Sequence, residues 1–174
     1  LLSTLCSSKK YRMLTSLMQK FTLLLLSLVL LAPLGIDLYL PTLPDIAVGL
    51  STPVAIVQTT IPIFLLVMGL GQIIAGPLVD NFGRKPIAMI GLLLYICGSA
   101  LAACALNWPM FLLARVVQGC AVCCTAVVAF SGVRDRLAGD EAAQAYGFLN
   151  GALNIVPALA PMLGGFLAEA FGWR

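Results

Sequence analysis

Two side chains of opposite charge, Asp37 and Arg115, each interrupt a long run of apolar residues. Asp37 lies six positions before Leu43, at the end of one apolar run, and Arg115 lies six positions after Pro109, at the start of another. Six positions span about 9 Å of helix. Both charges would thus lie at one depth, and we expect them to form a pair. A buried carboxylate holds a proton more readily than one in water, and a nearby guanidinium opposes this. Such a pair could couple proton binding to movement.

Each charge also has a simpler explanation. Asp37 could lie close enough to a membrane interface to be hydrated and purely structural, and Arg115 could stretch its long side chain to the interface. A charge deep in an apolar helix is costly and a guanidinium keeps its proton, so we expect Arg115 to be functional. Cys120 and Cys123 have the spacing of metal ligands, but the chain has no His. We therefore expect no metal site, no cofactor and no covalent chemistry.

Long apolar helices must position these charges. Of the 174 residues, 61% are apolar and 10% are charged, whereas roughly a quarter are charged in a typical soluble domain. A membrane-crossing helix needs about 20 mostly apolar residues. Five runs meet this requirement, so we predict an all-α, polytopic transmembrane bundle without a sizeable soluble domain. The five predicted spans are 21–43, 55–79, 87–106, 109–133 and 142–171.

The basic residues predict the orientation of the bundle, because Lys and Arg accumulate in cytoplasmic links. Residues 1–20 would form a basic cytoplasmic tail, in which Met13 or Met18 could be the true start. With the N-terminus inside, only Arg174 falls outside, and the bases do not gather on one polar face. We therefore expect a lipid bilayer and not a nucleic acid as the partner. The bases predicted to lie inside are Lys9, Lys10, Arg12, Lys20, Arg84, Lys85, Arg134 and Arg136.

Polar side chains recur every four residues in the last predicted span, at Tyr146, Asn150 and Asn154, and so share one helix face. Such a face would be costly against lipid, so we expect it to turn inward, where it either contacts a substrate or bonds another helix. Tyr39 and Gln118 are further cavity candidates. The same span carries helix-disrupting residues, which predict a kink or local opening beside a cavity. These residues are Pro157, Pro161, Gly164 and Gly165.

The link at 76–85, between the second and third spans, has the pattern GxLxDxxGRK. Gly83 can adopt a positive φ and make a tight turn. Asp80 would favour the positive N-terminal end of a nearby helix, while Arg84 and Lys85 would anchor the link at the inner surface. An ordinary basic loop would explain the two bases but not the glycine, acid and glycine that precede them at fixed spacing.

These segments resemble the major facilitator superfamily. The link at 76–85, which begins at Gly76, is similar to the superfamily's signature between helices 2 and 3. The run RVVQG at 115–119 resembles its fourth-helix motif, whose Arg is implicated in proton coupling. The run DLYLPTLPDIA at 37–47 is similar to the first helix of drug:proton antiporters of the bicyclomycin and chloramphenicol resistance type. The run at 157–165 resembles the antiporter motif of helix 5.

The resemblance implies that residues 21–174 are helices 1 to 5 of an incomplete six-helix N-terminal half, because such carriers contain two six-helix halves. It further implies that Asp80, Arg84 and Asp135 form a charge cluster at the cytoplasmic gate. The implied function is proton-driven export of drugs or other small lipophilic compounds across a bacterial inner membrane, with the missing C-terminal half as partner. A nutrient symporter for a sugar or amino acid and a non-transporting truncated remnant remain alternatives.

Overall fold

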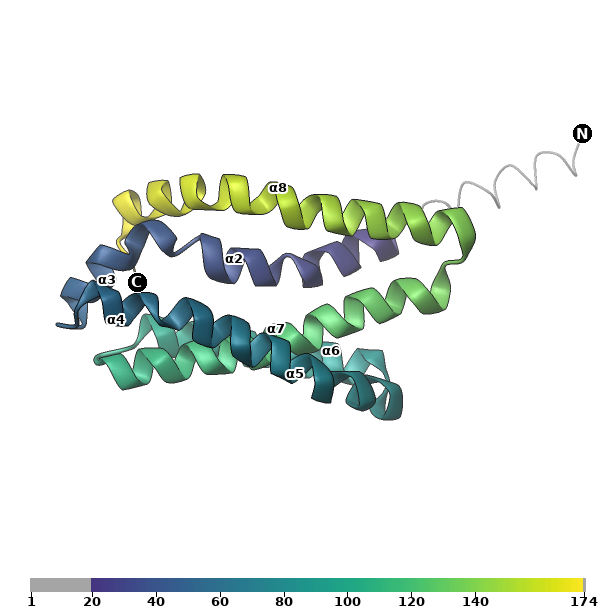
Figure 1. Cartoon of the computed structure of the whole chain (residues 1–174), viewed down its shortest axis with the longest axis horizontal. Coiled ribbons are helices and arrows are strands. Elements are labelled where there is room, and N and C mark those ends of the chain that lie inside the picture. Colours follow the sequence, from purple (N-terminus) through teal and green to yellow (C-terminus); the bar gives the residue numbers. More distant parts are fainter. Residues whose placement is uncertain (1–19, 174) are drawn as a thin grey trace, which may run out of the picture.

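The computed structural model describes residues 20–173, which are almost entirely helical (Figure 1). Residues 20–29 form the first helical segment, and eight further helical elements follow it in the described part of the chain. These elements are α2 (Leu31–Asp37), the 3-10 helix η1 (Leu40–Thr42), α3 (Leu43–Gly49), α4 (Val54–Gln58), α5 (Thr60–Phe82), α6 (Arg84–Ala103), α7 (Trp108–Arg136) and α8 (Gly139–Phe171). The predicted tail at 1–20 lies outside the described residues except for Lys20, which already belongs to the first helix.

These elements combine into five helices that are long and apolar enough to cross a membrane, as predicted. Their bounds are Lys20–Gly49, Val54–Phe82, Arg84–Ala103, Trp108–Arg136 and Gly139–Phe171. The first span extends beyond the predicted end at residue 43, because η1 and α3 continue it after a break at Leu38. Pro41 and Pro44 fall in the first turns of η1 and α3, where the missing N–H of proline removes no helical hydrogen bond.

Local chemistry explains the interruption of the second span at Thr59. Pro62 has no N–H to donate to the carbonyl of Gln58, so the helical ladder loses a bond at this point. The hydroxyl of Thr59 donates to the Ile56 carbonyl at 2.6 Å, and the buried hydroxyl of Thr60 donates to the Val57 carbonyl at 2.7 Å. The backbone N–H of Thr59 donates to the same two carbonyl groups, so these bonds reinforce the end of the short helix α4.

The central helix α7 packs closely against α6 through small residues. A Cβ atom added to Gly91 would lie 3.1 Å from the Ala121 carbonyl oxygen, and one added to Gly98 would lie 3.2 Å from the Ala114 carbonyl oxygen. Both pairs are seven residues apart along their helices and run in opposite order. The two helices are therefore antiparallel neighbours whose backbones approach closely, as small residues allow in membrane bundles.

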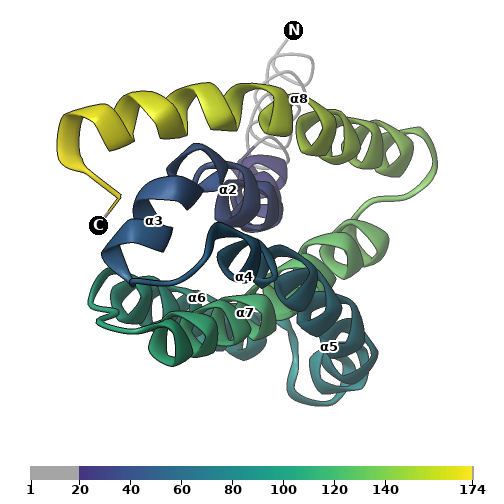
Figure 2. The same ribbon diagram turned by 60° about the vertical axis from the view of Figure 1, so that its left-hand side comes forward.

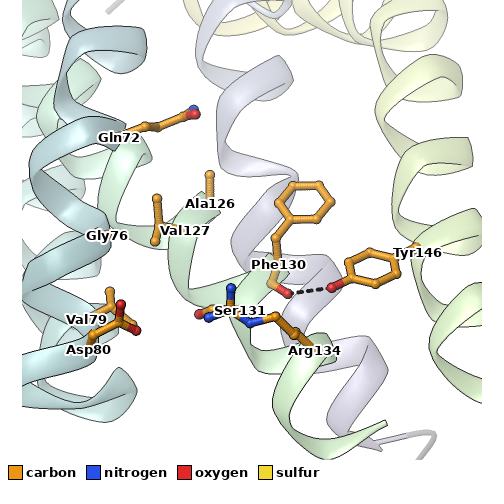
Figure 3. A pocket seen from close by; sticks show the side chains of 10 residues that line it. All are labelled: Gln72, Gly76, Val79, Asp80, Ala126, Val127, Phe130, Ser131, Arg134 and Tyr146. Atoms are coloured by element: carbon orange, nitrogen blue, oxygen red, sulfur yellow. Dashed lines mark hydrogen bonds between the residues drawn. The ribbon is translucent and has the colours of Figure 1, made fainter. Parts of the chain in front are cut away.

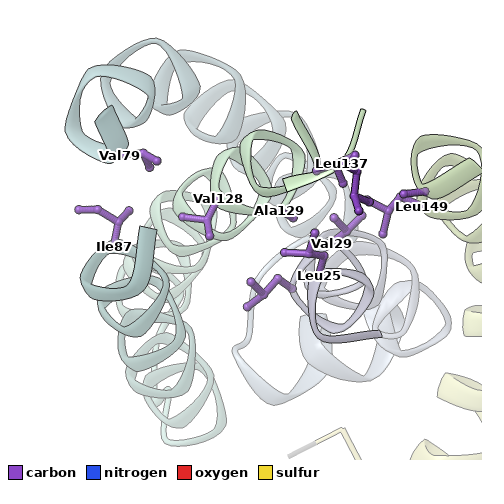
Figure 4. Close-up of a cluster of buried hydrophobic side chains, with 11 residues drawn as sticks. Leu25, Val29, Val79, Ile87, Val128, Ala129, Leu137 and Leu149 are labelled. Atoms are coloured by element: carbon purple, nitrogen blue, oxygen red, sulfur yellow. The ribbon is translucent and has the colours of Figure 1, made fainter. Parts of the chain in front are cut away.

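The bundle has two ends, which we name by residues of their links. The Gly83 end holds the α5–α6 and α7–α8 links, and the Asn107 end holds the α6–α7 link together with α3 (Figure 1). A cluster of buried side chains from the first span, α5, α6, α7 and α8 lies toward the Gly83 end (Figure 4). A second cluster at the Asn107 end includes Ile46, Val57 and Phe111, with Trp173 packed against it.

Helix α8 lies along the face of the first span opposite to α5 and α6 (Figure 2). We expected a kink or a local opening where Pro157 and Pro161 each remove a backbone donor. The helix runs unbroken from Gly139 to Phe171, so no local opening forms, and the alternative of a kink stays a prediction. The intact ladder on either side of the two prolines keeps the segment helical even though two of its hydrogen bonds are lost.

Candidate functional site

The helix α7 places Arg115 deep within the bundle. The side chain of Asn107 caps this helix by accepting a hydrogen bond from the backbone N–H of Met110 at 3.0 Å, and Pro109 suits the first turn. Arg115 follows about two turns later and is only 4% exposed. Phe111 and Gln118, one turn before and one turn after it, share its face of the helix and are also buried.

Polar groups from three helices surround the Arg115 guanidinium. Its Nη2 donates to the backbone carbonyl of Gly35 in α2 at 2.6 Å, and its Nη1 donates to Oε1 of Gln118 at 2.7 Å. The amide Nε2 of Gln118 in turn donates to the hydroxyl of Ser99 in α6 at 2.9 Å. The Nε atom of Arg115 is buried and has no hydrogen-bond partner. The network therefore links α2, α6 and α7 and leaves the Nε–H group of Arg115 unused.

Aromatic rings cover the same charge. The Cζ atom of Arg115 lies 4.0 Å from the ring centroid of Tyr39 and 5.0 Å from that of Phe64. The Tyr39 hydroxyl shares a hydrogen bond of 2.9 Å with the Thr60 hydroxyl, which fixes the ring against α5. Cation–π contacts of this kind are worth about 2 kcal/mol or more when they are shielded from water. Carbonyls and rings, and not a carboxylate, thus stabilise the buried cation.

The expected direct pair of Asp37 and Arg115 does not form in this structure. Among the described residues, the ion pairs are those of Asp135 with Arg84 and Arg134. Equal depth does not determine the direction of a side chain around its helix, and positions two apart point about 200° away from each other. Gly35 faces α7, so Asp37 faces another side and remains partly exposed at the end of α2. Arg115 thus contacts the first span at Gly35, two residues before Asp37, and forms no ion pair with Asp37.

A cavity of about 280 Å³ lies beside Arg115, toward the Asn107 end. Tyr39 and Gln118, two of the predicted cavity residues, both line it. Trp173 closes part of it, with its indole edge-on to Phe111 at a centroid distance of 6.3 Å. Asp37 is not among the lining residues. The remaining lining residues with polar side chains are Tyr95 and Ser99 of α6.

A second cavity, of about 380 Å³, opens at the Gly83 end between α5, α7 and α8 (Figure 3). Tyr146 closes one side of it. Its hydroxyl donates to the Phe130 carbonyl at 3.2 Å, and its ring stacks on the Phe130 ring at 6.2 Å with an interplanar angle of 11°. Gly76 and Asp80 line the opposite side (Figure 3). The only predicted polar-face residue that turns toward α7 is therefore Tyr146.

The other two residues of that face are exposed. The side-chain amide of Asn150 donates to the Tyr146 carbonyl at 2.9 Å, and that of Asn154 donates to the Asn150 carbonyl at 2.7 Å. Both amides thus bond the backbone of their own helix one turn earlier. Within the described residues, neither Asn150 nor Asn154 bonds another helix, and the expectation that they border a substrate cavity stays a prediction. Successive positions four apart rotate by about 40°, which carries the face away from α7.

Charged residues also meet at the Gly83 end. Gly83 has a φ of 86° and a ψ of 165°, which confirms the predicted positive φ at this tight turn between α5 and α6. Arg84 forms an ion pair with Asp135, and its Nε donates to the Ser131 hydroxyl at 3.4 Å. Asp80 is exposed and has no ion pair among the described residues, and Lys85 is also exposed. The cluster implied by the resemblance is therefore only partly assembled here.

Sequence reasoning missed several residues of these sites. Gly35 acts through its backbone carbonyl, and Phe64 through its ring face, so neither side-chain type indicates the contact. Ser99 offered a weak signal as a hydroxyl within an apolar span. Trp173 comes from the far end of the described chain, and only the fold brings it to the Arg115 cavity.

Five apolar helices of membrane length around a buried polar network define a multi-pass membrane protein. The chain belongs to the Major Facilitator Superfamily, whose sequence profile matches residues 25–174. It is 38% identical over 157 residues to the multidrug resistance protein MdtL of Citrobacter koseri, covering 90% of this chain and 40% of that protein. It is 39% identical over 155 residues to a chloramphenicol resistance protein of Pseudomonas aeruginosa, covering 88% of this chain and 37% of that protein. The chain spans about 40% of the length of the curated relatives it matches.

Proposed function

We propose that the chain is the N-terminal part of a secondary active transporter that exports drugs or other small lipophilic compounds in exchange for protons. The observation that carries this proposal is Arg115, a buried cation held by a carbonyl, an amide and aromatic rings, with Nε unused. A cation in such surroundings is available to a carboxylate in another conformation. The names of the relatives, which refer to multidrug and chloramphenicol resistance, support the direction of transport.

In this proposal Asp37 carries the proton. Its carboxylate would replace the Gly35 carbonyl as the partner of Arg115 in one conformation, and it would be protonated when the two separate. The energy of breaking a charged contact in a water-poor site is large, so protonation of Asp37 would shift the balance between the two arrangements. The protein residues only bind, orient and exchange a proton, and no covalent bond changes.

The orientation follows from the basic residues, which we propose to lie on the cytoplasmic side of a bacterial inner membrane. The Gly83 end, with Arg84, Lys85 and Asp135, would then be the cytoplasmic gate, and Asp80 would join it in a closed conformation. The Asn107 end would face outward. The exposed Asn150 and Asn154 would face the C-terminal half of the same carrier, so that the drug-binding cavity lies between the halves.

The test is drug tolerance of a sensitive bacterium that expresses the carrier containing this chain. We expect the parent to raise the inhibitory concentrations of chloramphenicol and of cationic dyes, and Asp37→Asn to abolish the rise. Asp45→Asn is the matched control, because Asp45 is exposed on α3 near the same end of the bundle. Exporter function is refuted if the parent confers no tolerance. The proton site is refuted if Asp37→Asn performs as well as the Asp45 control.

A further inference from the structure

Gly164 of α8 lies very close to the backbone of the first span. A Cβ atom added to Gly164 would overlap the carbonyl oxygen of Leu38 and would lie 2.7 Å from its carbonyl carbon and 3.1 Å from its Cα. Real Cβ atoms essentially never lie that close to backbone atoms, and a backbone group cannot rotate aside as a side chain can. Only glycine therefore fits at this position while α8 contacts the first span.

The neighbouring glycine makes a much looser contact. The nearest atom to a Cβ added at Gly165 is the Cβ of Pro41 at 3.9 Å, an ordinary van der Waals distance. At Gly147 and Gly151, nearer the start of α8, an added Cβ would meet nothing within 4 Å. The steric requirement within α8 is thus specific to Gly164.

The Leu38 peptide lies at a critical place in the first span. It directly follows Asp37, the last residue of α2, and precedes η1, so it forms the break in this span. On one side of the break, Gly35 and Tyr39 contact the Arg115 guanidinium on α7. On the other side, Gly164 of α8 abuts the Leu38 carbonyl. The segment that carries Asp37 is held between these two helices.

We propose that Gly164 is a positioning residue for Asp37: its close contact with Leu38 sets the break in the first span and so the placement of the Asp37 carboxylate relative to Arg115. This inference rests on the proposed function, because it assigns the contact a role in proton coupling. A methyl group at position 164 has to push α8 and the break apart, and the break is connected to Asp37 without any intervening residue.

The first experiment compares Gly164→Ala with Gly165→Ala in vesicles containing the carrier, by measuring drug–proton exchange over a range of pH. Both changes add the same methyl group to the same helix. Because an added Cβ at position 165 would meet no atom closer than 3.9 Å, we expect Gly165→Ala to keep the pH midpoint of the parent. We expect Gly164→Ala to slow exchange at least about tenfold, since a misplacement of about 1 Å can cost up to about a hundredfold, and to shift the pH midpoint. An unshifted midpoint in Gly164→Ala would overturn the proposal.

A second experiment covers the case in which Gly164→Ala does not fold. The 3.9 Å between the Pro41 Cβ and a Cβ at position 165 is within the range for a disulfide bond. We expect the double variant Pro41→Cys with Gly165→Cys to form this bond on mild oxidation. We expect the oxidised protein to have the same exchange rate and pH midpoint as the same variant in reduced form. Each single variant is the control for effects of the substitutions and of the native cysteines.

Both other outcomes of the cross-linking count against the inference. If no disulfide forms, α8 does not lie against the break as described. If the disulfide stops exchange and reduction restores it, the contact opens during transport and cannot be a fixed positioning contact. Formation of the disulfide does not depend on transport activity. If the parent itself exchanges no drug for protons, the proposed function fails, while the cross-link still reports on the contact.

Discussion

Replacement of Arg115 by Lys keeps the positive charge but removes the forked geometry that the site uses. Nη1 and Nη2 of Arg115 reach Gln118 and the Gly35 carbonyl at the same time, at 2.7 and 2.6 Å. A single ammonium nitrogen cannot occupy both positions, so one buried acceptor loses its partner, which costs about 1–3 kcal/mol. Weaker stacking on Tyr39 adds about 1 kcal/mol. We therefore expect Arg115→Lys to lower the free energy of unfolding by about 2–4 kcal/mol.

The assay is thermal unfolding of the purified carrier in detergent, followed by the loss of helical circular dichroism. In domains of 150–250 residues 1 kcal/mol shifts Tm by about 2–4 °C, and the shift is smaller in a longer chain, so we expect Tm of the carrier to fall by about 2–8 °C. Arg134→Lys is the matched control, because Arg134 is exposed and its contact with Asp135 is 3.7 Å long. We expect it to leave Tm nearly unchanged. If both variants melt with the parent, the hydrogen bonds of Arg115 to Gly35 and Gln118 do not stabilise the fold as we infer.

Two further predictions concern glycines of the helical framework. Gly83→Ala should destabilise the protein by about 1–3 kcal/mol, because the backbone conformation at Gly83 (φ 86°, ψ 165°) is accessible almost only to glycine. Gly69→Ala should not destabilise it, because an added Cβ at Gly69 in α5 meets no atom within 4 Å. Comparison of the Tm values of the two variants tests this prediction. Gly98→Val should reduce the amount of folded protein in the membrane, since an added Cβ already lies 2.8 Å from the Gln118 Cγ and overpacking costs about 1–3 kcal/mol. An unchanged yield relative to Gly69→Val would contradict the close α6–α7 packing.

The five spans could be predicted because the requirement they meet is local. A run of about 20 apolar residues crosses a bilayer whatever its neighbours are, and the links between such runs attract polar residues, glycine and proline. The turn at Gly83 was predictable for the same reason, since a positive φ is a property of a single residue. The depth of Arg115 also follows from counting along one helix.

The partners of these residues could not be predicted in the same way. Asp37 and Arg115 share a depth, but the rotation of each helix about its axis decides which group faces the other, and it places the Gly35 carbonyl against the guanidinium. Likewise, Asn150 and Asn154 share the spacing of Tyr146 but not its direction toward α7. Rotation and tilt are determined by close packing of whole helices, to which dozens of residues contribute.

For the part of the chain that the structure describes, the sequence by itself thus determined the five membrane-length helices and which of them carry charge. It also determined their bounds to within three residues, except at the end of the first span, which lies six residues later than predicted. Only the tertiary structure decided that Arg115 rests on a backbone carbonyl and aromatic rings, that Trp173 reaches its cavity, and that Gly164 abuts Leu38. The physical reason is that membrane insertion depends on the summed hydrophobicity of one segment. Contacts between segments depend instead on their relative rotation and distance, which no single segment encodes.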